Sequence, residues 1–105
     1  MIGEGMSVVG TLHFGEGVVR LDGHLEGKVI GRGTQVIGEK GNLQGETEVG
    51  TLILGGRVEG KVKVTGLAHI TPTGKLFGKV RTSQLVIDQG GIFEGEGESR
   101  KKEEP

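Results

Sequence analysis

The chain has 105 residues, of which 23 are glycine, two are proline and none is cysteine. Its single alanine, Ala68, stands against 27 β-branched residues, a balance that argues against helical bundles, coiled coils and βαβ nucleotide-binding folds. The 31 leucine, isoleucine, valine and phenylalanine residues are enough for a hydrophobic core, so the abundant glycine does not indicate disorder. The composition therefore favours one all-β domain punctuated by glycine.

The 13 basic and 14 acidic residues are interspersed along the chain, and the formal net charge is -1. A strongly basic face, which contact with nucleic acid would require, is not expected. The lack of cysteine excludes disulfides and thiolate metal sites, which suits a reducing compartment. We see no signal peptide and no apolar run long enough to span a membrane, and we expect a soluble cytoplasmic protein.

A repeated pattern, Gly-x-apolar-x-Gly, organises the chain between a short lead-in, residues 1–5, and a charged tail, residues 98–105, that we expect to be disordered. A degraded copy opens the repeat region, residues 6–97, and five clear copies follow it. The centres of the copies are separated by 17, 18, 15, 18 and 17 residues. These centres are Val8, Leu25, Leu43, Val58, Leu76 and Phe93.

Apolar residues also recur at two other fixed distances from the centres. Each repeat thus has three apolar positions, about six residues apart on average. Four residues after the centres stand Leu12, Val29, Thr47, Val62, Val80 and Gly97. Six residues before five of the centres stand Val19, Ile37, Leu52, Ile70 and Ile87. The arithmetic predicts a three-sided parallel β-helix, a β-solenoid of about six coils of ~17 residues.

The core ladder of this solenoid is predicted to consist of the inner centres and the column that precedes them. Its members are Leu25, Leu43, Val58, Leu76, Val19, Ile37, Leu52, Ile70 and Ile87. Glycines 27, 45, 60 and 78 are expected to point inward, where only a hydrogen fits. The 15-residue step between Leu43 and Val58 predicts one tighter corner near Gly50.

The remaining polar residues do not form a recognisable catalytic or cofactor site. Lys28, Glu46 and Lys61 would alternate in sign along one edge, which indicates a solvated face that keeps the coils in register. The histidines at 13, 24 and 69 fall in three different columns, so we predict no metal site. Gly74-Lys75 is followed by leucine instead of Ser or Thr, which excludes a P-loop. We predict no enzyme activity and no cofactor.

The two ends of such a solenoid carry the functional prediction. Each end coil presents unpaired backbone groups beside an open apolar core, and the chain has little material to cover them. We therefore expect the ends to pair with those of other copies and to form a filament without nucleotide. The predicted polymerisation interface comprises Phe93, Ile92, Val8, Met6 and Leu12.

Residues 2–10, the stretch Val36-Ile37-Gly38-Glu39 and the Gly-x-apolar-x-Gly copies together resemble the bactofilins over about residues 2–97. The resemblance implies a right-handed β-helix and a bacterial cytoskeletal protein that forms non-polar filaments. It also implies a scaffold for cell-wall synthesis or remodelling proteins that influences cell shape. Association with the inner membrane face is implied too, although residues 1–5 contain no clear targeting segment. A bulky apolar residue near the end of the core matters for polymerisation in the family, and Phe93 matches it.

Two other functions remain as alternatives at this point. The near-hexapeptide spacing of Leu25, Gly31, Ile37 and Leu43 is also typical of left-handed acyltransferase-like β-helix enzymes. Such an enzyme needs a catalytic histidine and an inserted loop, and neither is evident. A monomeric β-solenoid that binds partners through its charged columns is the second alternative.

Overall fold

A computed structural model describes residue 3 and residues 5–101 of the chain. The described residues form nine β-strands and no helix. The strands are β1 (Ser7–His13), β2 (Val18–Leu21), β3 (His24–Ile30), β4 (Thr34–Ile37), β5 (Asn42–Val49), β6 (Thr51–Leu54), β7 (Arg57–Ile70), β8 (Lys75–Ile87) and β9 (Ile92–Lys101).

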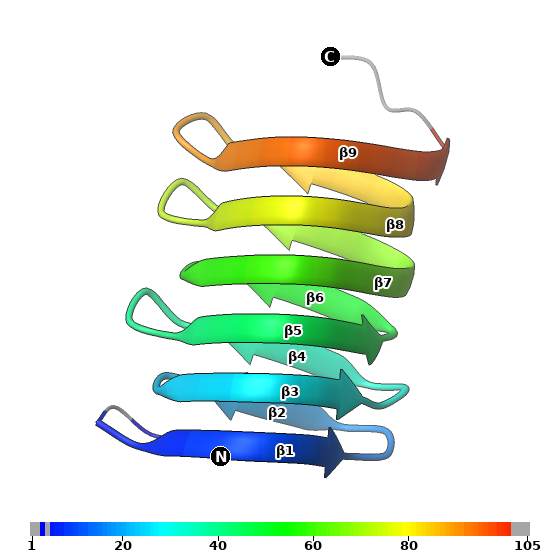
Figure 1. Ribbon diagram of the computed structural model, residues 1–105. Coiled ribbons are helices and arrows are strands. Elements are labelled where there is room, and N and C mark those ends of the chain that lie inside the picture. Colours follow the sequence, from blue (N-terminus) through cyan, green and yellow to red (C-terminus); the bar gives the residue numbers. More distant parts are fainter. Residues whose placement is uncertain (1–2, 4, 102–105) are drawn as a thin grey trace.

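The strands wind into a solenoid in which every pair of neighbours is parallel. One stack runs β1-β3-β5-β7-β8-β9, and a second consists of β2, β4, β6 and the carboxyl-terminal parts of β7 and β8. Figure 1 shows the chain climbing from β1 at one end to β9 at the other. The predicted all-β solenoid is thus confirmed. It has about five complete turns instead of six, because β9 only begins the sixth coil.

A glycine with positive φ divides each long strand into two segments. These glycines are Gly10, Gly27, Gly45, Gly60, Gly78 and Gly95, with φ between 128° and 141°. They are stacked in register, and a Cβ atom at Gly60 would collide with the carbonyl oxygen of Gly45. The expectation that they point into the core is wrong, because none of them is buried and the limiting contact is with the backbone of the preceding coil.

Each coil therefore has three faces. Face A is the segment of a long strand before its positive-φ glycine, and face B is the segment after it. Face C consists of β2, β4, β6, residues 67–70 of β7 and residues 84–87 of β8. Along each face the residues alternate between the core and the outside, as the burial pattern of β4 and β6 shows.

The core runs along the axis as stacked columns of apolar side chains. The column of repeat centres lies in the predicted register, and its four inner members are at most 1% exposed. These four are Leu25, Leu43, Val58 and Leu76. The next column, from Leu12 to Gly97, includes Thr47, whose hydroxyl donates a hydrogen bond of 2.6 Å to Gln35 Oε1 inside the core.

The third predicted column is wrong, because it mixes two columns of face C. Val19 stacks with Gln35, Leu52, Ala68 and Leu85, whereas Ile37 stacks with Leu21, Leu54, Ile70 and Ile87. Leu52, Ile37 and Ile70 are buried, but Val19 is only partly buried and Ile87 is 42% exposed. Val19 and Ile87 both belong to end coils, where the described residues supply an axial neighbour on one side only.

Corners of two lengths explain the mixing. His24 follows Leu21 by three positions, whereas Asn42 follows Ile37 by five. In the longer corner, the Gly41 N–H donates a hydrogen bond of 2.8 Å to the Gly38 carbonyl. The 15-residue step is shortened at two corners instead of one. It loses one residue near Gly50 and two at residues 55–56.

The carboxyl-terminal boundary of the core also differs from the one expected. β9 continues to Lys101, so residues 98–101 pair with β8 although the core was expected to end at residue 97. Backbone hydrogen bonds extend a strand without any need for apolar side chains, which is why composition did not indicate this extension. Residues 102–105 of the predicted tail lie outside the described residues, as do residues 1, 2 and 4 of the lead-in.

Candidate functional site

The two ends of the solenoid expose backbone edges. In the part of the chain that the structure describes, β1 pairs only with β3, β2 only with β4, and β9 only with β8. The outer edge of each of these strands therefore carries peptide N–H and C=O groups with no strand beside them. An edge of this kind can accept a further parallel or antiparallel strand from another chain.

Among the described residues, none covers the core at the amino-terminal end. Val8, Leu12 and Phe14 are only partly buried, and they pack against the buried columns of the coil that follows. The ring of Phe14 occupies the space that a side chain at Gly31 would need. This end thus presents three apolar side chains whose outer sides have no axial neighbour among the described residues.

As far as residue 101, the core at the carboxyl-terminal end is open in the same way. Phe93 stacks on Leu76 and is partly buried, and its ring also lies against Gly97, the last member of the Val80 column. Leu85 is partly buried, and Ile87 is 42% exposed, because no described strand pairs with residues 85–87 on their outer side. The two ends therefore resemble each other: at each, a phenylalanine ring beside a glycine partly covers the core.

Five residues were predicted to form the polymerisation interface, and the structure places three of them in the open core at the ends: Val8, Leu12 and Phe93. The other two lie elsewhere. Met6 precedes β1 at a corner, where the other coils hold a glycine, and is 53% exposed. Ile92 stacks on Lys75 in an outward column and is 40% exposed, so it lies beside the open core.

Sequence reasoning missed two of the end residues, Phe14 and Leu85. Phe14 stands six residues after the centre Val8, and the residues six after two later centres, Val49 and Val64, are buried. That spacing could have identified Phe14. Leu85 was hidden by the variable corner length, which shifted the column six residues before the centres onto Ile87 instead.

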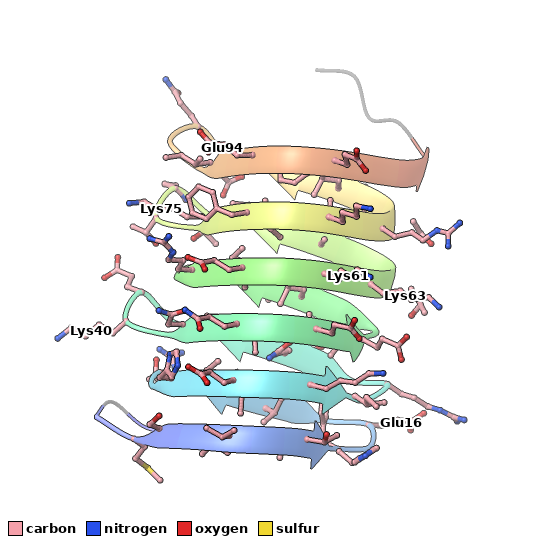
Figure 2. The ribbon with its side chains drawn as sticks, in the orientation of Figure 1. Glu16, Lys40, Lys61, Lys63, Lys75 and Glu94 are labelled. Atoms are coloured by element: carbon pink, nitrogen blue, oxygen red, sulfur yellow. The ribbon has the colours of Figure 1, made fainter. Side chains whose placement is uncertain are left out.

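Faces A and B carry stacked charges that are largely paired within the molecule. Lys28 lies 3.7 Å from Glu46, Lys63 lies 3.8 Å from Glu48, and Lys79 Nζ lies 3.8 Å from Glu96 Oε2, each pair joining neighbouring coils. Figure 2 shows such side chains projecting from the long strands, among them Lys61 and Lys63. These pairs are exposed, so each contributes ~1 kcal/mol or less to folding and mainly favours the observed register.

A shallow groove of about 580 Å³ follows face B across four coils. Its lining carries the cations Lys61, Lys63, Lys79 and Arg81 together with the carboxylates of Glu46, Glu48 and Glu96. Both signs of charge are present in nearly equal number, and no nucleophile lies beside a histidine base there. The groove has the character of a solvated wall, so the ends of the solenoid are the stronger candidate site.

The three histidines lie on separate coils. His24 Nε2 is 3.1 Å from Glu26 and His69 Nε2 is 2.9 Å from Asp88, while His13 ends β1. Among residues 3 and 5–101 there is no group of three or more His, Cys, Asp or Glu side chains that could hold a metal ion. In the same described residues, we find no helix with the length and apolar character needed to cross a membrane.

Comparison with known proteins agrees with this geometry. The family model described as "Bactofilin: Polymer-forming cytoskeletal" matches residues 1–98. No curated protein and no solved structure gives a significant match. Since the matched segment includes all the coils of the solenoid except the last residues of β9, the chain belongs to the bactofilin family of polymer-forming cytoskeletal proteins.

Proposed function

We propose that the protein polymerises end to end into filaments through the edge strands β1, β2 and β9. The observation that carries the proposal is the combination of unpaired strand edges and an open apolar core at both ends of the solenoid. A second subunit placed on either end would continue the backbone hydrogen bonds and cover the exposed sides of Val8, Leu12 and Phe93.

Backbone hydrogen bonds and apolar burial can both stabilise the junction between subunits without any cofactor. Hydrogen bonds between parallel or antiparallel edges need no bound ligand, and burial of apolar surface stabilises the contact by about 25 cal/mol per Å². Assembly should therefore proceed in the absence of nucleotide. Family membership supports polymer formation as such, and the geometry of the ends supports the position of the junction.

We further propose that like ends meet, so that the filament has no polarity, and that it serves as a scaffold for proteins that determine cell shape or build the cell wall. The family resemblance favours both points. The side walls support the scaffold role, because faces A and B would remain accessible along a filament whose junctions use only the ends.

Negative-stain electron microscopy of the purified chain, without nucleotide, tests the proposal. We expect filaments at micromolar concentration, and sedimentation should give the same polymer fraction after nucleotide is added. Size-exclusion chromatography can show whether the chain instead stays monomeric. A single 11.0 kDa species at every concentration would contradict end-to-end assembly and favour the monomeric binding module.

A further inference from the structure

Face C differs from the other two faces in the chemistry of its outer surface. The outward positions of its five coils are Val18, Arg20, Thr34, Val36, Thr51, Ile53, Leu67, His69, Gln84 and Val86. Half of these ten residues are aliphatic, and only Arg20 has a permanent charge. The aliphatic residues occur in every coil, in one or the other of two outward columns, and together they make up the apolar stripe of face C.

The outward positions of faces A and B in the same five coils are mostly charged. Of their twenty residues, eleven are Lys, Arg or Glu: Glu26, Lys28, Glu46, Glu48, Arg57, Glu59, Lys61, Lys63, Lys75, Lys79 and Arg81. A solvated antiparallel or solenoid surface is usually polar on its outer side. The depletion of charge on one face out of three indicates that face C is covered in the working assembly.

The few ionisable groups on face C have partners within the chain. The Arg20 guanidinium donates a hydrogen bond of 2.7 Å to Asp22, and this bond together with the carboxylate charge raises the pKa of Arg20. His69 Nε2 lies 2.9 Å from an oxygen of Asp88. Covering face C would therefore leave no cation without a counter-charge, which keeps the cost of removing water from it low.

The size of face C restricts what can cover it. Five coils at ~4.8 Å and a four-residue strand at ~3.3 Å per residue give a surface of about 300 Å² on one subunit. A stable interface needs roughly 800 Å² from each partner, so two isolated subunits would not pair through this face. Where successive subunits of a filament present face C on the same side, three or more of their stripes together exceed this area.

We propose that face C is a lateral interface between two filaments of this same chain, which pack with their face C sheets against each other. This inference rests on the proposed end-to-end filament. Outward Val36, Ile53 and Val86 of one filament interdigitate with the same residues of its neighbour, as in face-to-face packing of sheets ~10 Å apart. Because the contact of one subunit is too small to be stable, bundling appears only once filaments have formed.

A pair of matched variants tests the inference. Ile53→Lys places a charge in the centre of face C, and Gln44→Lys adds the same charge to an outward position of face A in the same coil. Low-speed sedimentation collects bundles, whereas high-speed sedimentation also collects single filaments. We expect Ile53→Lys to lower the amount of protein in the low-speed pellet about tenfold or more without changing the amount in the high-speed pellet. Each subunit loses part of its contact with the neighbouring filament, and these losses add up along the filament. Gln44→Lys should behave as the unaltered chain.

Electron microscopy of the same samples should show paired filaments for the unaltered chain and Gln44→Lys, and single filaments for Ile53→Lys. Should Ile53→Lys fail to give a native circular dichroism spectrum, Ile53→Thr keeps the β-branched shape and is expected to reduce bundling in the same direction. Bundling unaffected by the folded Ile53 variants would overturn the inference but leave the end-to-end filament standing. Absence of any filament from the unaltered chain would overturn both.

A lipid surface is the competing occupant, and vesicles of equal parts phosphatidylglycerol and phosphatidylcholine provide the probe. Single filaments in solution that co-sediment with these vesicles, and lose this property in Ile53→Lys, would assign face C to a membrane and overturn filament pairing. Paired filaments with no Ile53-dependent binding to the vesicles support the proposal.

Discussion

The ring of Phe93 lies against Gly97, so close that a Cβ atom at residue 97 would come within 2.8 Å of Phe93 Cε2. In the preceding coil the same two columns hold Leu76 and Val80, both buried. One ring that leans over a glycine thus takes the place of two aliphatic side chains. A change at Phe93 consequently alters the end surface of the solenoid and the contact with Leu76, while the contacts among the inner coils remain.

Phe93→Arg should leave the solenoid folded and prevent filament growth. A junction at this end would bury the guanidinium without a counter-charge, at a cost of about 3–5 kcal/mol. Phe77→Arg is the matched control, because Phe77 lies one coil away in an outward column, where its ring contacts the Arg57 guanidinium at 4.8 Å. We expect filaments from Phe77→Arg and none from Phe93→Arg by electron microscopy. Unchanged filaments from Phe93→Arg would remove Phe93 from the junction.

Variants at opposite ends should reveal the polarity of the filament. If like ends meet, Phe93→Arg retains its amino-terminal junction and Val8→Arg retains its carboxyl-terminal one, so each should stop at a dimer of twice the 11.0 kDa chain mass. Multi-angle light scattering of each variant, and of an equimolar mixture, provides the measurement. Two monomeric variants that combine into a mixed dimer would show head-to-tail junctions instead, and a polar filament.

The sequence was most informative about the register of the column formed by the repeat centres. The column from Val8 to Phe93 has the predicted register, because each centre stands two residues before a glycine and, except at Val8, two residues after another. Face C was predicted less well. Counting back six residues from a centre reaches Val19 after a short corner but Ile37 after a long one, and a single sequence carries no signal of which corner is longer.

Some of the residues at the ends of the solenoid were predicted from the sequence, and others were not. Phe93 follows from the column of centres. Leu85 and the position of Ile92 outside the core depend on the corner that precedes β9, which only the structure shows. The outer apolar stripe of face C was also missed, because Val36 and Ile53 belong to no column counted from the repeat centres.

The stacked glycines should tolerate no side chain in the middle of the solenoid. Gly60 has φ 128°, and a Cβ atom there would collide with the Gly45 carbonyl, so Gly60→Ala should destabilise the fold by about 1–3 kcal/mol or more. Gly15→Ala is the control, because a Cβ at Gly15 meets nothing within 4 Å. Denaturant unfolding in the Phe93→Arg background, at equal protein concentration, separates stability from assembly. Equal denaturant midpoints for Gly60→Ala and Gly15→Ala would contradict the steric requirement for glycine at the stacked positions.

The centre of the core should reject charge. Leu43 is 0% exposed and has a neighbour in its column on both sides, so Leu43→Arg buries an unpaired guanidinium and should prevent folding. Gln44→Arg changes the next residue, which lies on the outer surface, and should leave the far-ultraviolet circular dichroism spectrum native. A native spectrum from Leu43→Arg would mean that this column does not face the core.

The hydrogen bond between Thr47 and Gln35 should be a coupled pair. Both residues are 1% exposed, and the Thr47 hydroxyl donates to Gln35 Oε1 at 2.6 Å across the core. Thr47→Val removes the donor and leaves the buried Gln35 oxygen without it, which should lower the free energy of unfolding by about 1–3 kcal/mol.

Gln35→Leu alone should have a similar effect, because it leaves the Thr47 hydroxyl without an acceptor. In the combined Gln35→Leu and Thr47→Val variant, the loss of unfolding free energy should be smaller than the sum of the losses in the two single variants. The difference in this double-mutant cycle should be about 0.5–3 kcal/mol. Denaturant midpoints of the four proteins give this coupling. Additive losses would show that the two side chains find other partners when separated, and that the pair does not act as one buried polar unit.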